Sequence, residues 1–302
     1  MKIFLDNVNL NSTSGPNHFG TKLNKYISRL GATCTTNLDE SSLDVQLSFI
    51  ESIQNSNLPL VQRLDGIYFD IDTDNKLMNS NLQKTYENSA GVIFQSEYCR
   101  DLCFKYLGAH DNHTVIHNGA DYELIDEIEP LQDSLLDKFD TVWTCASRWR
   151  PWKRLRQNVE YFINFSGEND CLVVAGNPPD DEVVKHNRVF YVGRLPVDIL
   201  FSLYKRSKYF IHLARYDACP NVVVDARASG CQIICSSLAG TKEVAGPNAL
   251  VVEDVPWDLE PVSTSRIPDI KFDNVTKNTY NTNIDMTFVA KNYLNFLQKT
   301  LQ

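Results

Sequence analysis

Short apolar runs alternate with segments of helical periodicity along most of the chain. Apolar residues recur at helical spacing within residues 19–30, 75–89, 97–107, 197–204 and 221–229. The apolar runs predict buried strands at residues 2–8, 45–50, 58–64, 91–95, 113–116, 141–145, 171–175, 189–192, 209–213, 232–235 and 249–252. Because strands that alternate with helices form parallel sheets with crossover connections, the pattern predicts an α/β fold.

An acidic and weakly patterned stretch, residues 121–138, divides these elements into two sets. A chain of 302 residues is long enough for two domains of ordinary size. We therefore predict a first Rossmann-like domain over residues 1–125 and a second over residues 138–285. The second ends in an irregular stretch rich in Pro, Thr and Asn. Residues 286–302 then form an amphipathic helix, which packs most simply on its own domain.

The unit over residues 209–235 has the clearest candidate chemistry. Pro220 suits the first turn of a helix, where a missing N–H costs nothing. Gly230 suits the helix end. The helix start then lies beside the carboxyl end of a strand, where backbone N–H groups bind phosphate readily. Asp217 and Asp225, eight positions apart, are expected to line one wall of a cleft, although two solvated carboxylates on an ordinary unit fit the same letters.

A basic segment follows the predicted strand at residues 141–145. It contains Arg148, Arg150, Lys153, Arg154 and Arg156, with Trp149 and Trp152 between them. Basic residues interleaved with aromatic ones occur in single-stranded nucleic-acid grooves, but the net charge of −9 argues against a nucleic-acid partner. Arg forks and Lys point charges also suit a diphosphate. A solvated helix start remains the plain alternative.

Two loops in the first half of the chain, each following a predicted strand, are further candidate sites. Gly15 and Gly20 lie in a loop between a strand and a helix, which predicts either an anion-binding turn or a simple helix cap. The loop lacks the G-x-G-x-x-G pattern, so a dinucleotide cofactor is not expected. Arg63 and Asp65 follow an apolar strand closely. They indicate either a site at the carboxyl end of that strand or an Arg–Asp pair that holds a turn.

Composition limits the compartment and the cofactors. The longest apolar runs fall far short of the roughly 20 residues that span a bilayer. The eight cysteines include several within apolar runs, which predicts buried thiols and a reducing, cytoplasmic setting. The cysteine spacing is not that of a zinc site, so no metal is expected.

Three motifs, in order, resemble the GT-B glycosyltransferases of family 4. Residues 217–234 read DACPNVVVDARASGCQII, which is similar to the family's acidic signature, with Asp217 and Asp225 where the family usually has Glu. Residues 115–121 read VIHNGAD, close to the family's V-I-x-N-G-x-D. Arg148 and Lys153 keep the family's spacing of Arg, four residues, Lys.

The resemblance implies two doubly wound, Rossmann-like domains facing a central cleft, with the last helix crossing back onto the first domain. It also implies transfer of a sugar from a nucleotide-diphosphate sugar, with retention at the anomeric carbon and without metal or other cofactor. The acceptor is a glycan, a lipid or a small molecule, and contact with a membrane surface is left open. A nucleotide-sugar-binding protein with reduced catalysis and a sugar-nucleotide epimerase of GT-B type are the alternatives.

The family's roles carry over to matching positions. Arg148 and Lys153 are implied to stabilise the departing diphosphate, helped by N–H groups near Pro220 and Asn221. The carboxylates would bind donor hydroxyls, Asp225 those of the ribose and Asp217 those of the sugar. Substituting Asp for Glu shortens each reach by one methylene. The remaining candidates are Asp65 as a catalytic group of the first domain, with Gly193, Arg194, Leu195 and Gly15 on the donor side.

Overall fold

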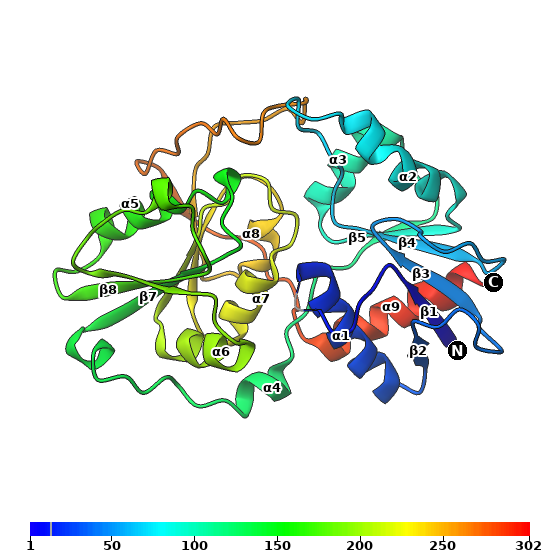
Figure 1. Cartoon of the computed structure of the whole chain (residues 1–302), viewed down its shortest axis with the longest axis horizontal. Helices are drawn as coiled ribbons and strands as arrows, with labels where there is room; N and C mark the ends of the chain where they lie inside the picture. Colours follow the sequence, from blue (N-terminus) through cyan, green and yellow to red (C-terminus); the bar gives the residue numbers. More distant parts are fainter. Residues whose placement is uncertain (13) are drawn as a thin grey trace. The chain divides into compact units, whose positions relative to one another are not determined.

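The computed structural model describes residues 1–12 and 14–302, which form two compact units. Unit 1 comprises Met1–Gly119, Leu259–Val262 and Asn283–Gln302. Unit 2 comprises Ala120–Asp258 and Ser263–Thr282. Each unit has its own sheet, as Figure 1 shows, and its own buried apolar clusters.

Unit 1 is built on a six-stranded parallel sheet with strand order β2-β1-β3-β4-β5-β6 (Figure 1). Its strands are β1 (Lys2–Asp6), β2 (Thr33–Thr35), β3 (Val45–Phe49), β4 (Leu60–Leu64), β5 (Gly91–Phe94) and β6 (His113–Val115). Its helices are α1 (Gly15–Arg29), α2 (Asn75–Asn88), α3 (Glu97–Leu107) and α9 (Met286–Thr300). The four inner strands are almost wholly buried because helices cover a parallel sheet on both faces.

Helix α9 completes the core of unit 1. It lies beside α1, and both helices contribute to one buried apolar cluster with β1, β3 and β4. Asp285 caps α9, since its carboxylate accepts hydrogen bonds from the backbone N–H groups of Thr287 and Phe288 at 2.7 and 3.2 Å. The fully buried Arg63 of β4 donates from Nε to the Tyr293 hydroxyl of α9 at 3.0 Å. The amphipathic pattern at residues 286–302 therefore forms a helix whose apolar face packs within unit 1.

Unit 2 has a seven-stranded sheet with strand order β13-β12-β11-β10-β7-β8-β9, parallel except for β13. The strands are β7 (Thr141–Ala146), β8 (Asp170–Ala175), β9 (Val189–Gly193), β10 (Tyr209–His212), β11 (Gln232–Ser236), β12 (Leu250–Val252) and β13 (Val275–Lys277). The α-helices are α4 (Tyr122–Asp126), α5 (Leu155–Phe165), α6 (Val197–Arg206), α7 (Asn221–Ala228) and α8 (Thr241–Val244). Three 3₁₀ turns complete the unit: η1 (Leu136–Lys138), η2 (Pro151–Lys153) and η3 (Asp180–Glu182).

Helices cover both faces of this second sheet. On one face, Trp143 and Leu172 pack in a cluster with α5. On the other face, Val142 and Val173 pack with Leu203 of α6. Because successive strand residues point to opposite faces, two apolar layers arise from the same strands. The arrangement is doubly wound, and the predicted α/β class is confirmed.

Several short elements were not predicted, among them β2, β13, α4 and α8. Strands β2 and β13 have three residues each and lie at sheet edges, and none of these residues is fully buried, which leaves little apolar pattern. Helix α4 lies in the acidic stretch and contains five residues, of which Ile125 is the buried one. The segment 256–283, expected to be irregular, therefore contains β13. Elements this short are fixed by tertiary pairing, which local periodicity does not report.

Candidate functional site

The candidate site lies at the carboxyl end of the sheet of unit 2. Strands β7 and β10 are neighbours, so the loops that follow them lie side by side. The loop after β7 contains η2, and the loop after β10 leads into α7. The backbone N–H of Arg215 donates to the carbonyl of Trp152 at 2.9 Å, which ties the two loops together. Lys153 and Asp217, which are 64 positions apart in the chain, are thereby brought into contact.

Lys153, Asp217 and His212 form a compact polar cluster at this point. The ammonium group of Lys153 donates to Oδ2 of Asp217 in an ion pair. Nε2 of His212 lies 2.8 Å from the same oxygen. The side chains of Lys153 and Asp217 are 16% and 17% exposed, and that of His212 is 3% exposed. One carboxylate oxygen therefore serves two donors at the border between core and solvent.

The cluster fixes the charge of its members. Burial alone raises the pKa of Asp217, but the charge of Lys153 and the hydrogen bond from His212 outweigh it, and the pKa falls well below 3.8. Burial lowers the pKa of His212 below 6.5, and Asp217 offsets only part of that effect. Asp217 is therefore ionised and His212 is neutral at pH 7. A neutral His212 donates its Nε2 proton to Asp217.

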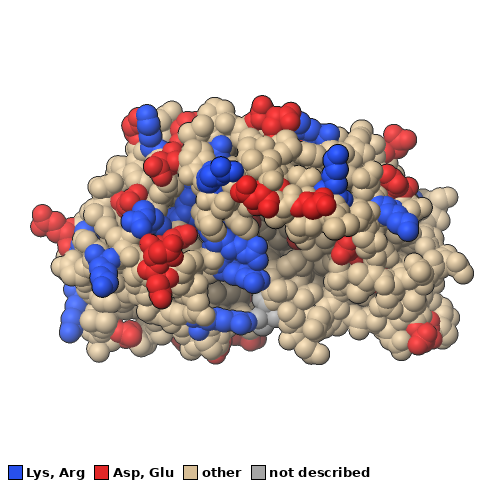
Figure 2. All heavy atoms as spheres, turned by 45° about the horizontal axis from the view of Figure 1, so that its top comes forward, with Lys and Arg blue, Asp and Glu red and all other residues tan. Residues whose placement is uncertain are grey.

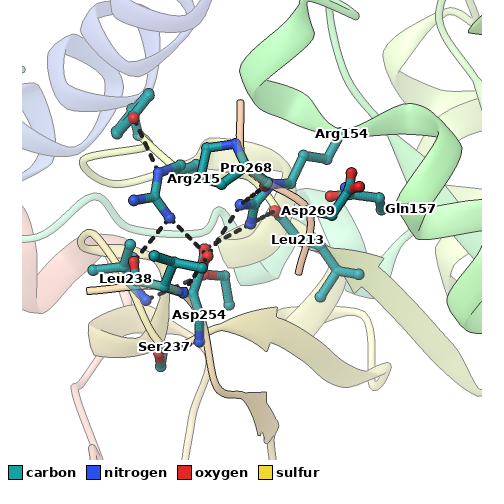
Figure 3. Close-up of polar contacts among 12 residues, drawn as sticks. Arg154, Gln157, Leu213, Arg215, Ser237, Leu238, Asp254, Pro268 and Asp269 are labelled. Atoms are coloured by element: carbon teal, nitrogen blue, oxygen red, sulfur yellow. Dashed lines mark hydrogen bonds and ion pairs between the residues drawn. The ribbon is translucent and has the colours of Figure 1, made fainter. Parts of the chain in front are cut away.

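A second, fully buried network lies beside this cluster, and Figure 3 shows two arginines converging on Asp254. Arg154 binds Asp254 through both guanidinium Nη atoms, at 2.6 and 3.0 Å. Arg215 donates to Asp254 Oδ1 at 2.7 Å and to the carbonyl of Val255 at 2.9 Å. The Ser236 hydroxyl donates to Oδ2 at 2.8 Å. A carboxylate with this many donors holds its surroundings rigidly.

The network positions the residues of the first cluster. Arg154 follows Lys153 directly and adopts a left-handed conformation with φ of 55° where η2 meets α5. Arg215 precedes Asp217 by two residues, and Asp254 follows β12. Three loops, from three strands, are thus held by one buried carboxylate. Since a non-Gly residue in this conformation is strained, the two bonds from Arg154 to Asp254 offset a real cost.

The other predicted donor residues are distributed around this edge. Arg148 is exposed, and the structure gives its side chain no ion pair within residues 1–12 and 14–302. Asp225 lies in the second turn of α7 and is 4% exposed. Pro220 is the N-cap of α7, and Asn221, half-buried, is its first residue. The structure thus brings Lys153 and Asp217 into contact and leaves Arg148 outside their cluster.

The predicted base-binding segment follows β9. Gly193 has a φ of 67°, and its carbonyl accepts a hydrogen bond from the N–H of Gly176 at 2.7 Å. The N–H of Arg194 donates to Oδ1 of Asn177 at 3.2 Å. Leu195 is half-buried and packs beside the apolar cluster under α6. The loops after β8 and β9 are therefore joined by two hydrogen bonds.

The candidates of unit 1 receive different support. Gly15 is the first residue of α1, while Thr13 of the same predicted anion-binding turn lies outside the described residues. Asp65 follows β4 directly and is half-buried. The guanidinium of Arg63 instead binds Tyr293 and Asn118, the latter at 2.8 Å. The alternative in which Arg63 and Asp65 pair to hold a turn is wrong, because the Arg63 side chain points into the core.

Sequence reasoning missed His212, Arg215 and Asp254. His212 ends an apolar strand, where a buried histidine has no distinctive pattern. Asp254 follows a strand in the letters EDVP, a place suited to a turn as much as to a buried ion pair. The sequence could have indicated these residues through their common position at or just after strand ends, because functional side chains gather at the carboxyl edge of a parallel sheet.

Neither a cluster of metal ligands nor a helix fit to cross a membrane occurs in the part of the chain that the structure describes. Among residues 1–12 and 14–302, no three His, Cys, Asp or Glu side chains are grouped as metal ligands. Within those residues, no helix has both the length and the apolar character to cross a bilayer. On the face drawn in Figure 2, basic side chains are interspersed with acidic ones.

Solved structures define the fold class. The chain is similar to sucrose-phosphate synthase from Thermosynechococcus elongatus, with a TM-score of 0.65, 13% identity and coverage of 86% of this chain and 87% of that one. HepE of Anabaena, in complex with UDP and glucose, has a TM-score of 0.59 and 15% identity, with coverage of 100% of this chain and 92% of that one. AviGT4, a glycosyltransferase involved in avilamycin A biosynthesis, has a TM-score of 0.64 and 12% identity, with coverage of 100% of this chain and 98% of that one. The fold is GT-B, as the resemblance predicted.

The family comparison concerns the part of the chain that holds the site. Residues 140–260 match the family model described as "Glycosyl transferases group 1". These residues include both clusters described above. No curated protein sequence matches the chain. The predicted resemblance to GT-B glycosyltransferases is confirmed.

Proposed function

We propose that this protein is a glycosyltransferase that moves a sugar from a nucleotide-diphosphate sugar to an acceptor, with retention and without a metal ion. The observation that carries the proposal is the contact between Lys153 and Asp217. It lies at the carboxyl edge of the sheet, inside the segment that matches the group 1 family model. A similar structure, HepE, is a complex with UDP and glucose, which supports a nucleotide-sugar donor.

The chemistry follows from the charges at this edge. The departing nucleoside diphosphate gains negative charge in the transition state, and preplaced cations stabilise that charge best where water is excluded. Lys153 is placed for this role, and the exposed Arg148 is free to reach a second phosphate oxygen. The N–H groups at the start of α7, near Pro220 and Asn221, add partial positive charge.

The carboxylates would orient the donor. Asp217 is ionised, so it accepts hydrogen bonds from sugar hydroxyls, and Asp225 accepts them from the ribose. Asp217 has a shorter side chain than the Glu that the family usually has at this position. Its carboxylate is held by the hydrogen bond from Nε2 of His212. This second contact fixes the carboxylate, since each hydrogen bond to it removes rotational freedom.

A coupled binding and turnover assay tests the proposal. UDP, GDP, ADP and their sugar conjugates are screened by thermal shift, and the conjugate that binds is incubated with sugar, lipid and glycan acceptors. Lys153→Ala is expected to lose transfer while keeping its fold. Lys185→Ala, an exposed lysine of the same unit, is the matched control and is expected to keep it. Near-normal turnover of Lys153→Ala contradicts the assignment.

The ion pair itself also favours a second candidate, a nucleotide-sugar-binding protein with reduced catalysis. In the described structure, Lys153 is paired with Asp217, so a phosphate must compete with that carboxylate for its ammonium group. This candidate predicts donor binding without transfer or donor hydrolysis. An epimerase of GT-B type is separated by product analysis, because it returns a changed donor without any acceptor.

A further inference from the structure

The phosphate-binding cation of the proposed function already has a partner. The ammonium of Lys153 is bound to Asp217, and both side chains are more than four-fifths shielded from solvent. A donor diphosphate must therefore compete with Asp217 for the same cation. When Lys153 leaves, Asp217 keeps one described partner for its Oδ2 atom, which is His212 at 2.8 Å.

The charge of His212 depends on Asp217 and Lys153, because the rest of its surroundings is neutral or more distant. Its ring stacks on Phe210, with ring centres 6.4 Å apart and planes 15° apart. On the neighbouring strand β11, Cys235 pairs with it in register, and burial raises the pKa of that thiol to about 12, so the thiol is neutral. Helix α7, which packs on β10, contributes the buried Asp225. The charges that act on His212 directly are Asp217 and Lys153.

We propose that binding of the donor diphosphate draws Lys153 from Asp217 to the phosphates and that His212 takes up one proton from solvent as this happens. The inference rests on the proposed function, because it needs a diphosphate at this edge. The proton adds to Nδ1 of the ring, since Nε2 already carries the hydrogen donated to Asp217. No other bond forms or breaks.

The direction of the proton transfer follows from the contacts. In the free protein, burial and the nearby Lys153 both oppose a charged imidazole. Once Lys153 has turned to the phosphates, its repulsion is weaker, and the diphosphate brings further negative charge. A shielded carboxylate without a cation is costly, and an imidazolium at 2.8 Å removes that cost. His212 thus replaces the charge that Asp217 loses.

Proton uptake makes donor affinity depend on pH. A binding step that takes up one proton tightens by at most about tenfold for each pH unit of acidification. The effect is confined to the interval between the pKa of His212 in the free protein, which lies below 6.5, and its higher pKa in the complex. His212 is therefore a positioning residue whose protonation accompanies donor binding.

Calorimetric titration of the full chain with UDP tests this inference. At pH 7.5 the terminal phosphate of UDP is already mostly ionised, since its second pKa is about 6. The titration is repeated in buffers of different ionisation enthalpy, so that the number of protons exchanged is measured. The wild type is expected to take up roughly half a proton or more per UDP, with tighter binding at pH 6.5 than at pH 8.0.

Two variants make the test specific. His212→Gln keeps a hydrogen-bond donor toward Asp217 but cannot gain a charge, so its proton uptake is expected to fall to near zero. His186→Gln, a half-buried histidine that precedes β9 at the other end of the sheet, is the control and is expected to match the wild type. If His212→Gln does not fold, ¹⁵N signals of the six histidines in the wild type report whether one ring becomes charged on addition of UDP.

The outcomes separate the two proposals. UDP binding with the same enthalpy in every buffer, or proton uptake that persists in His212→Gln, overturns this inference and leaves the proposed function intact. If none of UDP, GDP, ADP, CDP and dTDP binds, the proposed function fails and the inference falls with it. If another of these nucleotides binds in place of UDP, it becomes the titrant with the same expectations.

Discussion

The guanidinium of Arg154 and the carboxylate of Asp254 form a two-pronged ion pair with both side chains at most 1% exposed. The pair joins the start of α5 to the loop after β12, a separation of 100 residues. Arg215 binds the same carboxylate from the loop after β10. A single acidic side chain therefore holds two buried arginines, and its removal leaves both without their counter-charge.

Asp254→Asn is expected to destabilise the protein strongly. Breaking one side of a buried ion pair typically costs about 3–5 kcal/mol, because an uncompensated charge stays in the core. The free energy of unfolding in urea measures this. Asp137→Asn is the matched control, because it removes the partly exposed pair with Arg206 at 3.5 Å. The control is expected to change stability by less than about 1 kcal/mol, and equal losses in both variants contradict the network.

His212 is expected to make stability depend on pH. Its pKa is lowered by folding, so between that lowered value and about 6.5 the unfolded chain binds a proton that the folded protein does not. Stability from this group is present above pH 6.5 and is lost as the pH falls, by at most about 1.4 kcal/mol per pH unit. Urea unfolding at pH 7.5 and 5.5 should show a smaller fall in His212→Gln than in the wild type. The same fall in both proteins contradicts the assignment.

Gly176 is expected to tolerate no side chain. A Cβ atom there would lie 2.0 Å from the carbonyl oxygen of Ser147, and the residue has a φ of 99°. Gly230 has the same φ of 99° but has open space around it. Gly230→Ala therefore measures backbone strain alone, about 1–3 kcal/mol. Gly176→Ala should cost clearly more and should displace the loop that contains Arg148, so that UDP affinity falls. Equal unfolding midpoints for the two variants would refute the close approach.

Tyr293→Phe is expected to weaken unit 1. The lost hydroxyl accepts a hydrogen bond from Nε of the fully buried Arg63 at 3.0 Å. An unmet buried donor on a charged group costs about 1–3 kcal/mol. Tyr68→Phe removes a hydroxyl from a side chain in a residue that is 45% exposed, and little change is expected there. Thermal unfolding followed by circular dichroism compares the two, and identical midpoints would argue against the bond.

The sequence predicts the long elements because their apolar periodicity is local. Strand β8 and helix α3 are found almost to the residue, and the helix of residues 286–302 is found from its apolar face alone. Strand β13 was missed because all three of its residues are exposed and its pairing with β12 comes from a distant segment.

The candidate site was predicted in part. Lys153 and Asp217 were each selected from spacing and chemistry, and each was given a role toward the donor. Their contact with one another depends on β7 and β10 being neighbours in the sheet, which no local pattern reveals. The same holds for Asp254, whose two arginine partners lie 39 and 100 residues away.

The composition of unit 1 has a consequence for how the protein is made. Its sheet is complete by Val115, but helix α9 is supplied by residues 286–300. During synthesis the N-terminal sheet must therefore wait, with the part of its apolar face that α9 covers still open, until residues 286–300 have left the ribosome. Unit 2, drawn mostly from one continuous segment, needs no such delay. We expect the half that is translated first to finish folding last, and to be the half that depends on chaperones in the interval.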